Sequence, residues 1–600
     1  IISREYPELV DVSSNEKVDL IYFPTGGGKT ETYLGAVVFN MFFDRIRGKK
    51  SGTTAIMKFP LRLLSLQQLQ RAANITAQAE LIRRQEKDLR DSDSFSIGYF
   101  VGSNNTPNSL YEKEGQKEID LIPEILEMTQ QERNEKFLIT SQCPFCQKEE
   151  VIIDVLVDER RLVHRCVNKE CSEDVLPIYI VDREIYRYLP TFTISTLDKS
   201  AVIGLQRNFR NIFGNVKRKC PQHGYTSHDF CTEQESCKIP AENFETVDLY
   251  DPAPSLIIQD ELHLVRESLG AFNAHYETFI NYFLRNLSKE RKPIKIIAAT
   301  ATISDYKQQV YHLYHKEALR FPSPSPDLKE SFYAFVDEQD LNRVIVGIAP
   351  YGKTPIYSIL DILQYYREEV YKFYANPLLL KEIKGMPDLS LEDCKKIIKD
   401  YWVMLEYNQI KNEGMQVVQS VKTMINDRLQ NNNLPALNVK TMTGDDTFKD
   451  IREILAEIER PRGELPNIDL IAATSMISHG VDADSFNFML FYGVPKNTAE
   501  YIQAYSRAGR KYPALIIMVF NSNREKDSSY NQHFVKFNEY KDILVESVPI
   551  NRWANNAVEK TLPGLFSALL LSHYDFQIPD LKIYMLSGFQ KAYRSGFLPS

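Results

Sequence analysis

Short apolar segments along the chain alternate with turns and amphipathic stretches. The segment VDLIYFPTGGGKTETYLGAVVFNMFF, which begins at Val18, runs from an apolar strand through a glycine turn into a helix. The segment PSLIIQDELHLVRESLG, which begins at Pro254, places another buried strand before two carboxylates. Residues 149–165, EEVIIDVLVDERRLVHR, alternate apolar and polar positions as a β-hairpin does. The pattern predicts ligand-binding groups at the ends of buried strands, as in open parallel sheets.

The second half of the chain contains a break and several helical segments. The prolines of RFPSPSPDLKE, which begins at Arg320, exclude a helix, and amphipathic helices follow. We predict a linker and helical insertion over residues 304–400 and the start of a helical domain over residues 541–600. The best apolar run, Leu565 to Leu571, is about a third of the ~20 residues that a membrane span needs. We therefore expect a soluble, cytoplasmic protein without a membrane partner.

Composition narrows this picture. A chain of 600 residues exceeds the size of one hydrophobic core, so two to four domains are expected. A net charge of -8 argues against bulk electrostatic capture of a phosphate backbone, so any nucleic-acid contact must be local. Seven of the eight cysteines lie between Cys143 and Cys237, which indicates metal binding in a reducing compartment. The first residues contain neither an initiator Met nor a signal peptide, and we expect upstream sequence to be missing.

The glycine turn after the first strand has the composition of a phosphate-binding loop. Lys29 would reach the β- and γ-phosphates of ATP, and the Thr30 hydroxyl would hold Mg²⁺. Backbone groups of the loop would approach the nucleotide at Thr25, Gly26, Gly27 and Gly28. Phe23 stands where the strict pattern has glycine. The alternative is a plain glycine turn before a helix.

The acidic pair after the strand at Leu256 complements this loop. Asp260 would position Mg²⁺, and Glu261 would orient and deprotonate the attacking water. A solvated acidic strand end is the alternative, although the preceding phosphate loop favours the catalytic interpretation.

PTGGGKTE and DELH resemble motifs I and II of superfamily 2 helicases of the DEAH-like kind. That family implies an α/β fold with two RecA-like domains, the first over residues 1–303 and the second over residues 401–540. Further segments resemble its other motifs in order: MKFPLRLLSLQQLQR with Pro60 and Gln67, ISTLDK with Thr196 and Asp198, AATATIS with Thr300 and Thr302, YWVMLEYN, TMTGDD, and LIAATSMISHGVDADSFN with Thr474, Gly480 and Asp482.

YIQAYSRAGR resembles motif VI, in which Gln503, Arg507 and Arg510 project toward the nucleotide. The resemblance implies that Arg507 and Arg510 act as arginine fingers when the two domains close. It also places Gly480 and Asp482 near the nucleotide and Thr474 near the nucleic acid. Ser506 replaces the usual glycine.

Two cysteine clusters lie in a predicted insertion over residues 104–240. Cys143, Cys146, Cys166 and Cys171 have the paired spacing of a zinc ribbon around the predicted hairpin. Cys220, His223, Cys231 and Cys237 could close a second zinc site, but their spacing is irregular. Free thiols or an exchange of ligands with the first cluster remain alternatives, and His228 is either a substitute ligand or a surface residue.

A basic and aromatic stretch precedes the second cluster. It contains Arg207, Phe209, Arg210, Phe213, Lys217, Arg218 and Lys219. Phosphate contact with base stacking and a solvated helix face are both compatible with this pattern.

Together with the cysteine-rich insertion, the motifs most resemble the DrmA-type helicases of the DISARM anti-phage system, and more widely the MrfA and Druantia helicases. This resemblance implies an ATP-dependent helicase or translocase that acts on DNA, either single-stranded or duplex with a single-stranded end, and a DrmB-like protein partner. Two alternatives stay open: an ATP-switched nucleic-acid scaffold that does not unwind, and an RNA helicase.

Overall fold

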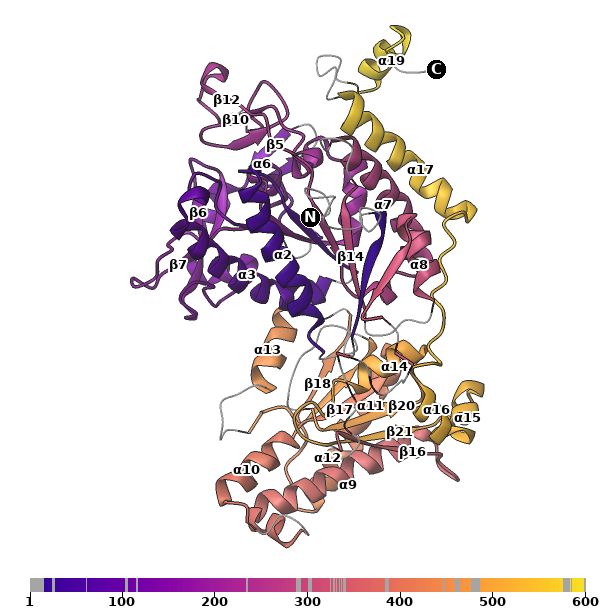
Figure 1. Cartoon of the computed structure of the whole chain (residues 1–600). Coiled ribbons are helices and arrows are strands. Elements are labelled where there is room, and N and C mark those ends of the chain that lie inside the picture. Colours follow the sequence, from indigo (N-terminus) through magenta and orange to yellow (C-terminus); the bar gives the residue numbers. More distant parts are fainter. Residues whose placement is uncertain are drawn as a thin grey trace. The chain divides into compact units, whose positions relative to one another are not determined.

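The computed structural model describes most of the chain between residues 16 and 597. Outside the description are residues 1–15, 24–26, 61, 103–105, 115–116, 234–235, 288–292, 301–304, 324, 327–329, 331, 334, 336, 338–340, 384–387, 445, 447, 459–464, 476–485, 576–582, 584 and 598–600, and the side chains of 62–67, 113–114, 117, 448–449 and 452. The chain forms two compact units (Figure 1). Unit 1 contains residues 1–301, 305–323 and 547–600, and unit 2 contains residues 302–304 and 324–546.

The core of unit 1 is a parallel sheet. Its register pairs Val18 with Ile296 and with Ala318, so the carboxyl ends of these strands share one edge. In order across the sheet, the strands are β15 (Ala318–Phe321), β1 (Val18–Tyr22), β14 (Lys295–Thr300), β13 (Leu256–Gln259), β2 (Ala55–Phe59), β9 (Phe192–Thr196), β3 (Ile97–Phe100) and β8 (Ile178–Tyr179).

Helices cover both faces of this sheet because successive strand residues point to opposite sides. Met57 and Ile258 belong to the core shared with the helices after β1 and β2. Lys58, one residue further on, forms a buried ion pair of 2.5 Å with Glu277 of α7 on the other face. The helices of unit 1 are α2 (Lys29–Ile46), α3 (Arg62–Gln85), α4 (Ile122–Glu127), α5 (Gln130–Phe137), α6 (Asp182–Tyr188), α7 (Glu267–Leu287), α8 (Tyr306–Tyr314), α17 (Asn555–Leu569) and α19 (Leu586–Arg594).

Small antiparallel sheets lie outside the main sheet of unit 1, and the second and third of them carry the cysteine clusters. They are the hairpins β4 (Tyr111–Glu114) with β5 (Lys117–Asp120) and β6 (Val151–Leu156) with β7 (Arg161–Cys166), and the sheet of β11 (Gly224–Thr226), β10 (Arg218–Cys220) and β12 (Glu245–Thr246). Strands β8 and β9 of the main sheet lie between the two cysteine clusters in sequence. The region predicted as one insertion over residues 104–240 is therefore two separate insertions, with strands β8 and β9 of the main sheet between them.

Unit 2 is a second parallel α/β layer. The strands of its sheet, in order, are β16 (Arg343–Ile348), β21 (Ala514–Val519), β20 (Phe488–Tyr492), β17 (Met404–Asn408), β19 (Leu470–Ala473) and β18 (Val439–Met442). Its helices are α9 (Pro355–Ala375), α10 (Leu391–Asp400), α11 (Lys411–Ser420), α12 (Asn426–Asn431), α13 (Phe448–Ile458), α14 (Thr498–Tyr505), α15 (Glu525–Gln532) and α16 (Phe534–Tyr540). The two parallel sheets with flanking helices confirm the predicted fold class.

Two segments lie differently from their predicted domains. The stretch predicted as a linker over 304–400 contributes α8 and β15 to unit 1 and the edge strand β16 to unit 2. Residues 547–600 pack on unit 1, where Arg552 donates to the His312 carbonyl oxygen (3.1 Å) and to Thr278 Oγ1 (2.9 Å). Long-range packing of this kind has no local sequence signal.

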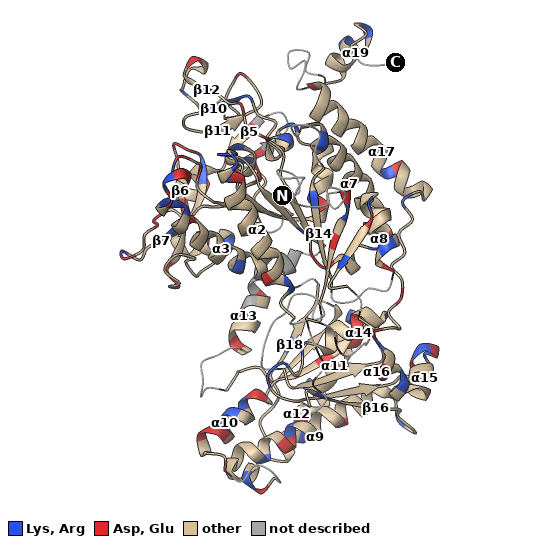
Figure 2. Ribbon diagram, viewed as in Figure 1, with Lys and Arg blue, Asp and Glu red and all other residues tan. Residues whose placement is uncertain are grey.

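Charged residues of both signs are mixed along the surface helices, as Figure 2 shows for α10 and α15. Within the described part of the chain, no helix has both the length and the apolar composition for a membrane span.

Candidate nucleotide and metal sites

The predicted phosphate loop lies between β1 and α2. Gly28 caps α2 with φ 81°, a left-handed conformation that favours glycine. Lys29 Nζ donates to the Phe23 carbonyl oxygen at 3.1 Å, so the lysine folds back over the start of the loop. Gly27 is exposed, while Thr25 and Gly26 lie outside the described residues.

A tyrosine joins the loop to the acidic pair. Tyr33, on the buried face of α2, donates its hydroxyl to Asp260 Oδ2 at 2.8 Å and lies 3.2 Å from Thr30 Oγ1. The structure therefore brings Thr30 and Asp260 to one place, although they are far apart in sequence. The sequence analysis did not identify Tyr33 as a site residue. Its position one helical turn after Thr30 could have indicated that its side chain lies beside Thr30.

The acidic pair has a constrained backbone. Glu261 has φ 47°, and its N–H donates to Asp260 Oδ1 at 2.9 Å. His263 Nδ1 lies 3.4 Å from Glu261 Oε2 and 3.1 Å from Thr300 Oγ1. His263 thus links the acidic pair to the end of β14, where AATATIS begins, and it too was missed as a site residue. Thr302 lies outside the described residues.

The electrostatics around Asp260 are unfavourable for an isolated carboxylate. Burial and the charge of Glu261 raise the pKa of Asp260 to about 7, against the opposing effects of Tyr33 and Lys29. A cation bound at this carboxylate would offset the cost of ionising it. The donor set of Thr30 hydroxyl and Asp260 carboxylate is oxygen only, which fits Mg²⁺.

The resemblance to the helicase motifs places Thr196 and Asp198 beside the nucleic acid. Their segment and the segment around Pro60 reach the same carboxyl edge. Pro60 follows β2, Gln67 lies in α3, and Thr196 ends β9, where it is buried. Asp198 is exposed at the start of the 3₁₀ segment η3 (Leu197–Gly204). The side chain of Gln67 lies outside the description.

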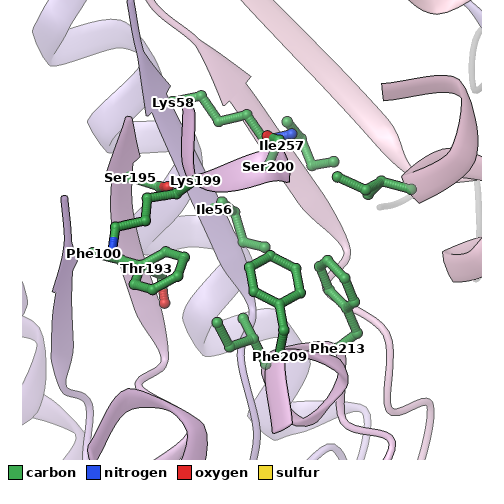
Figure 3. Close-up of a pocket in the computed structure, with 12 residues that line it drawn as sticks. Ile56, Lys58, Phe100, Thr193, Ser195, Lys199, Ser200, Phe209, Phe213 and Ile257 are labelled. Atoms are coloured by element: carbon green, nitrogen blue, oxygen red, sulfur yellow. The ribbon is translucent and has the colours of Figure 1, made fainter. Parts of the chain in front are cut away.

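A small pocket lies beneath η3 (Figure 3). Figure 3 shows Lys58 and Lys199 among its lining residues, with the rings of Phe100, Phe209 and Phe213. Lys199 is paired with Asp182 at 2.5 Å, and Lys58 is paired with Glu277. Both ammonium charges are therefore compensated, and the pocket offers mainly apolar surface.

The residues of YIQAYSRAGR lie on and after α14 in unit 2. Gln503 and Arg507 are buried, and Arg510 follows the turn at Gly509, whose φ is 73°. Ser506 has φ −67°, so a side chain is accommodated where the family has glycine. Arg343 of β16 donates to the Ala508 carbonyl oxygen at 2.7 Å and holds this turn. Sequence reasoning missed Arg343, because it is distant in sequence.

Of the residues predicted in LIAATSMISHGVDADSFN, Thr474 follows β19, and its N–H donates to the Met442 carbonyl oxygen at 3.2 Å. Gly480 and Asp482 lie outside the described residues.

The first cysteine cluster closes at one end of the β6–β7 hairpin. The sulfurs of Cys143 and Cys171 are 3.7 Å apart, and those of Cys146 and Cys166 are 3.8 Å apart. All four ligand atoms lie within 4.8 Å of one another. Four sulfurs at ~2.3 Å from a tetrahedral zinc ion are about 3.8 Å apart, so the geometry fits this metal. Disulfides would require about 2.05 Å.

The second cluster brings together the four residues with irregular spacing. Cys220 Sγ lies 3.8 Å from His223 Nδ1 and 3.8 Å from Cys237 Sγ, and Cys231 completes the group within 4.8 Å. His228 is not part of it. It is buried and stacks on Phe230 at 4.9 Å, so it is not the predicted surface residue either.

The β6–β7 hairpin connects the two clusters. Its strand β7 ends at Cys166 of the first cluster, and its turn contains Asp158, whose carbonyl oxygen lies 3.1 Å from His223 Nε2. This contact leaves Nδ1 for a metal, as ring nitrogens of metal-bound histidines usually require. Glu233, near Cys231, is paired with Arg160 of the same turn at 3.4 Å.

The buried residues of the basic and aromatic stretch before the second cluster fit neither of its predicted roles. Phe209 and Phe213 are buried, and Arg210 is almost fully buried. Arg210 Nη1 donates to the Leu571 carbonyl oxygen at 2.7 Å and lies 3.3 Å from Asp575. The stretch therefore anchors the C-terminal segment to unit 1.

Comparisons with known proteins agree with this architecture. A profile of the helicase conserved C-terminal domain matches residues 395–512. The DISARM protein DrmA of Bacillus paralicheniformis is 31% identical over 609 residues, which cover 94% of this chain and 51% of DrmA. The chain is therefore similar to DrmA along nearly all of its length, and it contains a segment that matches the helicase conserved C-terminal domain.

A solved helicase structure has a similar fold. The DUF1998 helicase MrfA bound to DNA superposes with a TM-score of 0.51 and 14% identity over 94% of this chain and 52% of MrfA. The chain spans about half the length of the relatives it matches.

Proposed function

We propose that this chain is the ATP-driven motor of a DNA helicase or translocase in bacterial anti-phage defence. The observation that carries the proposal is the contact of Tyr33 with both Thr30 and Asp260. This contact joins a phosphate loop to an acidic pair at the carboxyl edge of a parallel sheet, where nucleotides bind.

Each residue of the site has a defined task. Lys29, with Thr25, Gly26, Gly27 and Gly28, would hold the phosphates, and Thr30 and Asp260 would hold Mg²⁺, which would neutralise phosphate charge when bound. Glu261 orients the attacking water and accepts its proton. By resemblance to the helicase motifs, Gly480 and Asp482 would contact the nucleotide, and Gln503, Arg507 and Arg510 would stabilise the charge that develops on the γ-phosphate.

The substrate and setting are inferred from the relatives. MrfA was crystallised with DNA, and DrmA belongs to DISARM. We propose that this chain acts on DNA in the cytoplasm and has a DrmB-like partner. Zn²⁺ in the two four-ligand clusters has a structural role, because neither set leaves an open position for water.

The deciding experiment measures ATPase activity of wild type and Glu261→Gln with single-stranded DNA, duplex DNA or RNA at one fixed salt concentration. We expect DNA to stimulate the wild type. Glu261→Gln should bind ATP and lose nearly all turnover, whereas Lys29→Ala should bind ATP poorly. Undiminished turnover in Glu261→Gln would contradict the proposed mechanism. Stimulation of the ATPase by RNA alone would show that RNA, not DNA, is the substrate.

A further inference from the structure

The edge strand β15 places an exposed aromatic ring beside the phosphate loop. Phe321 ends β15 opposite Ile21 of β1, and its side chain is 40% exposed. Its ring meets that of Phe23 edge to face, with centroids 6.1 Å apart. Phe23 in turn accepts the hydrogen bond from Lys29, so the aromatic pair lies next to the phosphate-binding lysine.

A second contact holds this edge in place. The Arg320 guanidinium lies over the Tyr22 ring at 4.3 Å from its centroid, which ties the end of β15 to the end of β1. The position of Phe321 is therefore fixed by neighbours on both strands, and its ring is presented at the edge where the loop starts.

The order of the strands gives the bound nucleotide a direction. Asp260 and Glu261 follow β13, which is separated from β1 by β14, whereas β15 flanks β1 on the opposite side. The γ-phosphate must point toward the acidic pair, because the attacking water is activated there. The other end of the nucleotide then extends from the loop toward β15.

We propose that Phe321, supported by Phe23, is a stacking platform for the nucleobase of the bound nucleotide. This inference rests on the proposed ATP site and extends it to the base. Every base has a π-face, so stacking of this kind strengthens binding without selecting strongly between bases. The platform therefore serves a purine or pyrimidine nucleoside triphosphate, with no polar readout of the base at Phe321.

The test distinguishes the contribution of the base to binding from that of the phosphates. Calorimetric titration with Mg-ATP and with Mg-tripolyphosphate is carried out on the wild-type chain, Phe321→Ala, Phe321→Trp and Lys29→Ala. The matched control is Leu319→Ala, because Leu319 lies two residues earlier on the same face of β15 and is also exposed.

Phe321→Ala should weaken ATP binding by roughly 5- to 100-fold, the range for loss of one base stack, and leave tripolyphosphate binding unchanged. Phe321→Trp and Leu319→Ala should both bind ATP like the wild type. Unchanged ATP affinity in Phe321→Ala, or an equal loss for ATP and tripolyphosphate, overturns the platform. If Lys29→Ala binds neither ATP nor tripolyphosphate in that case, the proposed ATP site is still supported. A wild-type chain that binds neither ligand refutes the proposed function itself.

Discussion

At the scale of single residues, side chains outside the motifs position those within them. Tyr33 bridges Thr30 and Asp260, and His263 lies between Glu261 and Thr300. Each connects groups from different strands, so the motif residues alone do not define the site.

We predict that Tyr33→Phe lowers kcat for ATP hydrolysis roughly tenfold, because a hydrogen bond to a charged group contributes about 1.5 kcal/mol. Steady-state kinetics would measure it. Tyr314→Phe is the matched control, since its buried hydroxyl oxygen has no hydrogen-bond partner among the residues that the structure describes, and its removal should have little effect. Equal kinetics in the two variants would contradict a role for the Tyr33 bridge.

A buried carboxyl in unit 2 predicts a pH dependence of stability. Burial raises the pKa of Glu406 from its ordinary value of 4.5 to about 8, although Asn408 opposes the shift. Between these values the unfolded chain releases a proton that the folded chain keeps, so stability falls as pH rises, by at most about 1.4 kcal/mol per pH unit. Glu406→Gln should remove this part of the slope and be more stable than wild type at pH 8.

Thermal unfolding from pH 5 to 8 would measure this difference in stability, with exposed Glu525→Gln as control. Parallel pH profiles for wild type and Glu406→Gln would contradict it.

At the scale of elements, the β6–β7 hairpin is the common support of both metal clusters. One end carries Cys166, and the turn at the other end contacts His223. Loss of the metal from one cluster should therefore weaken metal binding in the other cluster through this hairpin.

We predict that metal analysis finds zinc in both clusters and that Cys166→Ser and Cys237→Ser each remove one ion. In Cys237→Ser the remaining zinc should be chelated faster, because loss of such supporting contacts typically costs 10- to 100-fold in affinity. Cys394→Ser is the control, since this buried cysteine lies in α10 of unit 2, apart from both clusters. Full zinc content in Cys166→Ser would disprove the four-cysteine site, and unchanged chelation in Cys237→Ser would disprove the coupling.

Helix α17 packs closely on the rest of unit 1 through glycine. A Cβ on Gly204 would lie 2.3 Å from the Gly564 carbonyl oxygen. His275 Nδ1 lies 2.7 Å from Thr561 Oγ1 in the same contact. The helix therefore fits only where η3 has no side chain at residue 204.

We predict that Gly204→Ala destabilises unit 1 by about 1–3 kcal/mol, as overpacking usually does, and speeds proteolysis in residues 547–575. Gly35→Ala is the control, because a Cβ there meets nothing within 4 Å and the residue lies in helix α2. Limited proteolysis with mass spectrometry would locate the cuts. The same cleavage pattern in wild type and Gly204→Ala would refute the packing argument.

At the scale of the whole molecule, the chain passes from unit 1 to unit 2 near residue 324 and returns near residue 547. Groups proposed for ATP hydrolysis come from both units. Residues of unit 2 are thus proposed to take part in hydrolysis in addition to those of unit 1.

We predict that Arg510→Ala binds ATP almost normally but loses DNA-stimulated hydrolysis by on the order of 10³-fold, because an arginine finger acts chiefly on the transition state. ATP binding and ATPase rates with and without DNA would be compared with those of Lys511→Ala, the exposed neighbour. If weaker DNA binding were the sole defect, Arg510 would belong to the DNA path.

The sequence by itself determined the groups whose chemistry is local. The glycine turn before Lys29, the carboxylates after β13 and the pairs around Cys143 and Cys166 each occur in a short segment, and their spacing is set by the ligand they fit. The alternation over residues 149–165 likewise predicted the hairpin.

Only the tertiary structure decided what depends on distant segments. It placed Tyr33 against Asp260, returned β8 and β9 to the main sheet between the clusters, and buried Arg210 against residues 571–575. A local pattern records which residues must be buried or bind a ligand, but it does not record the partner. That choice results from packing the whole chain into shared cores.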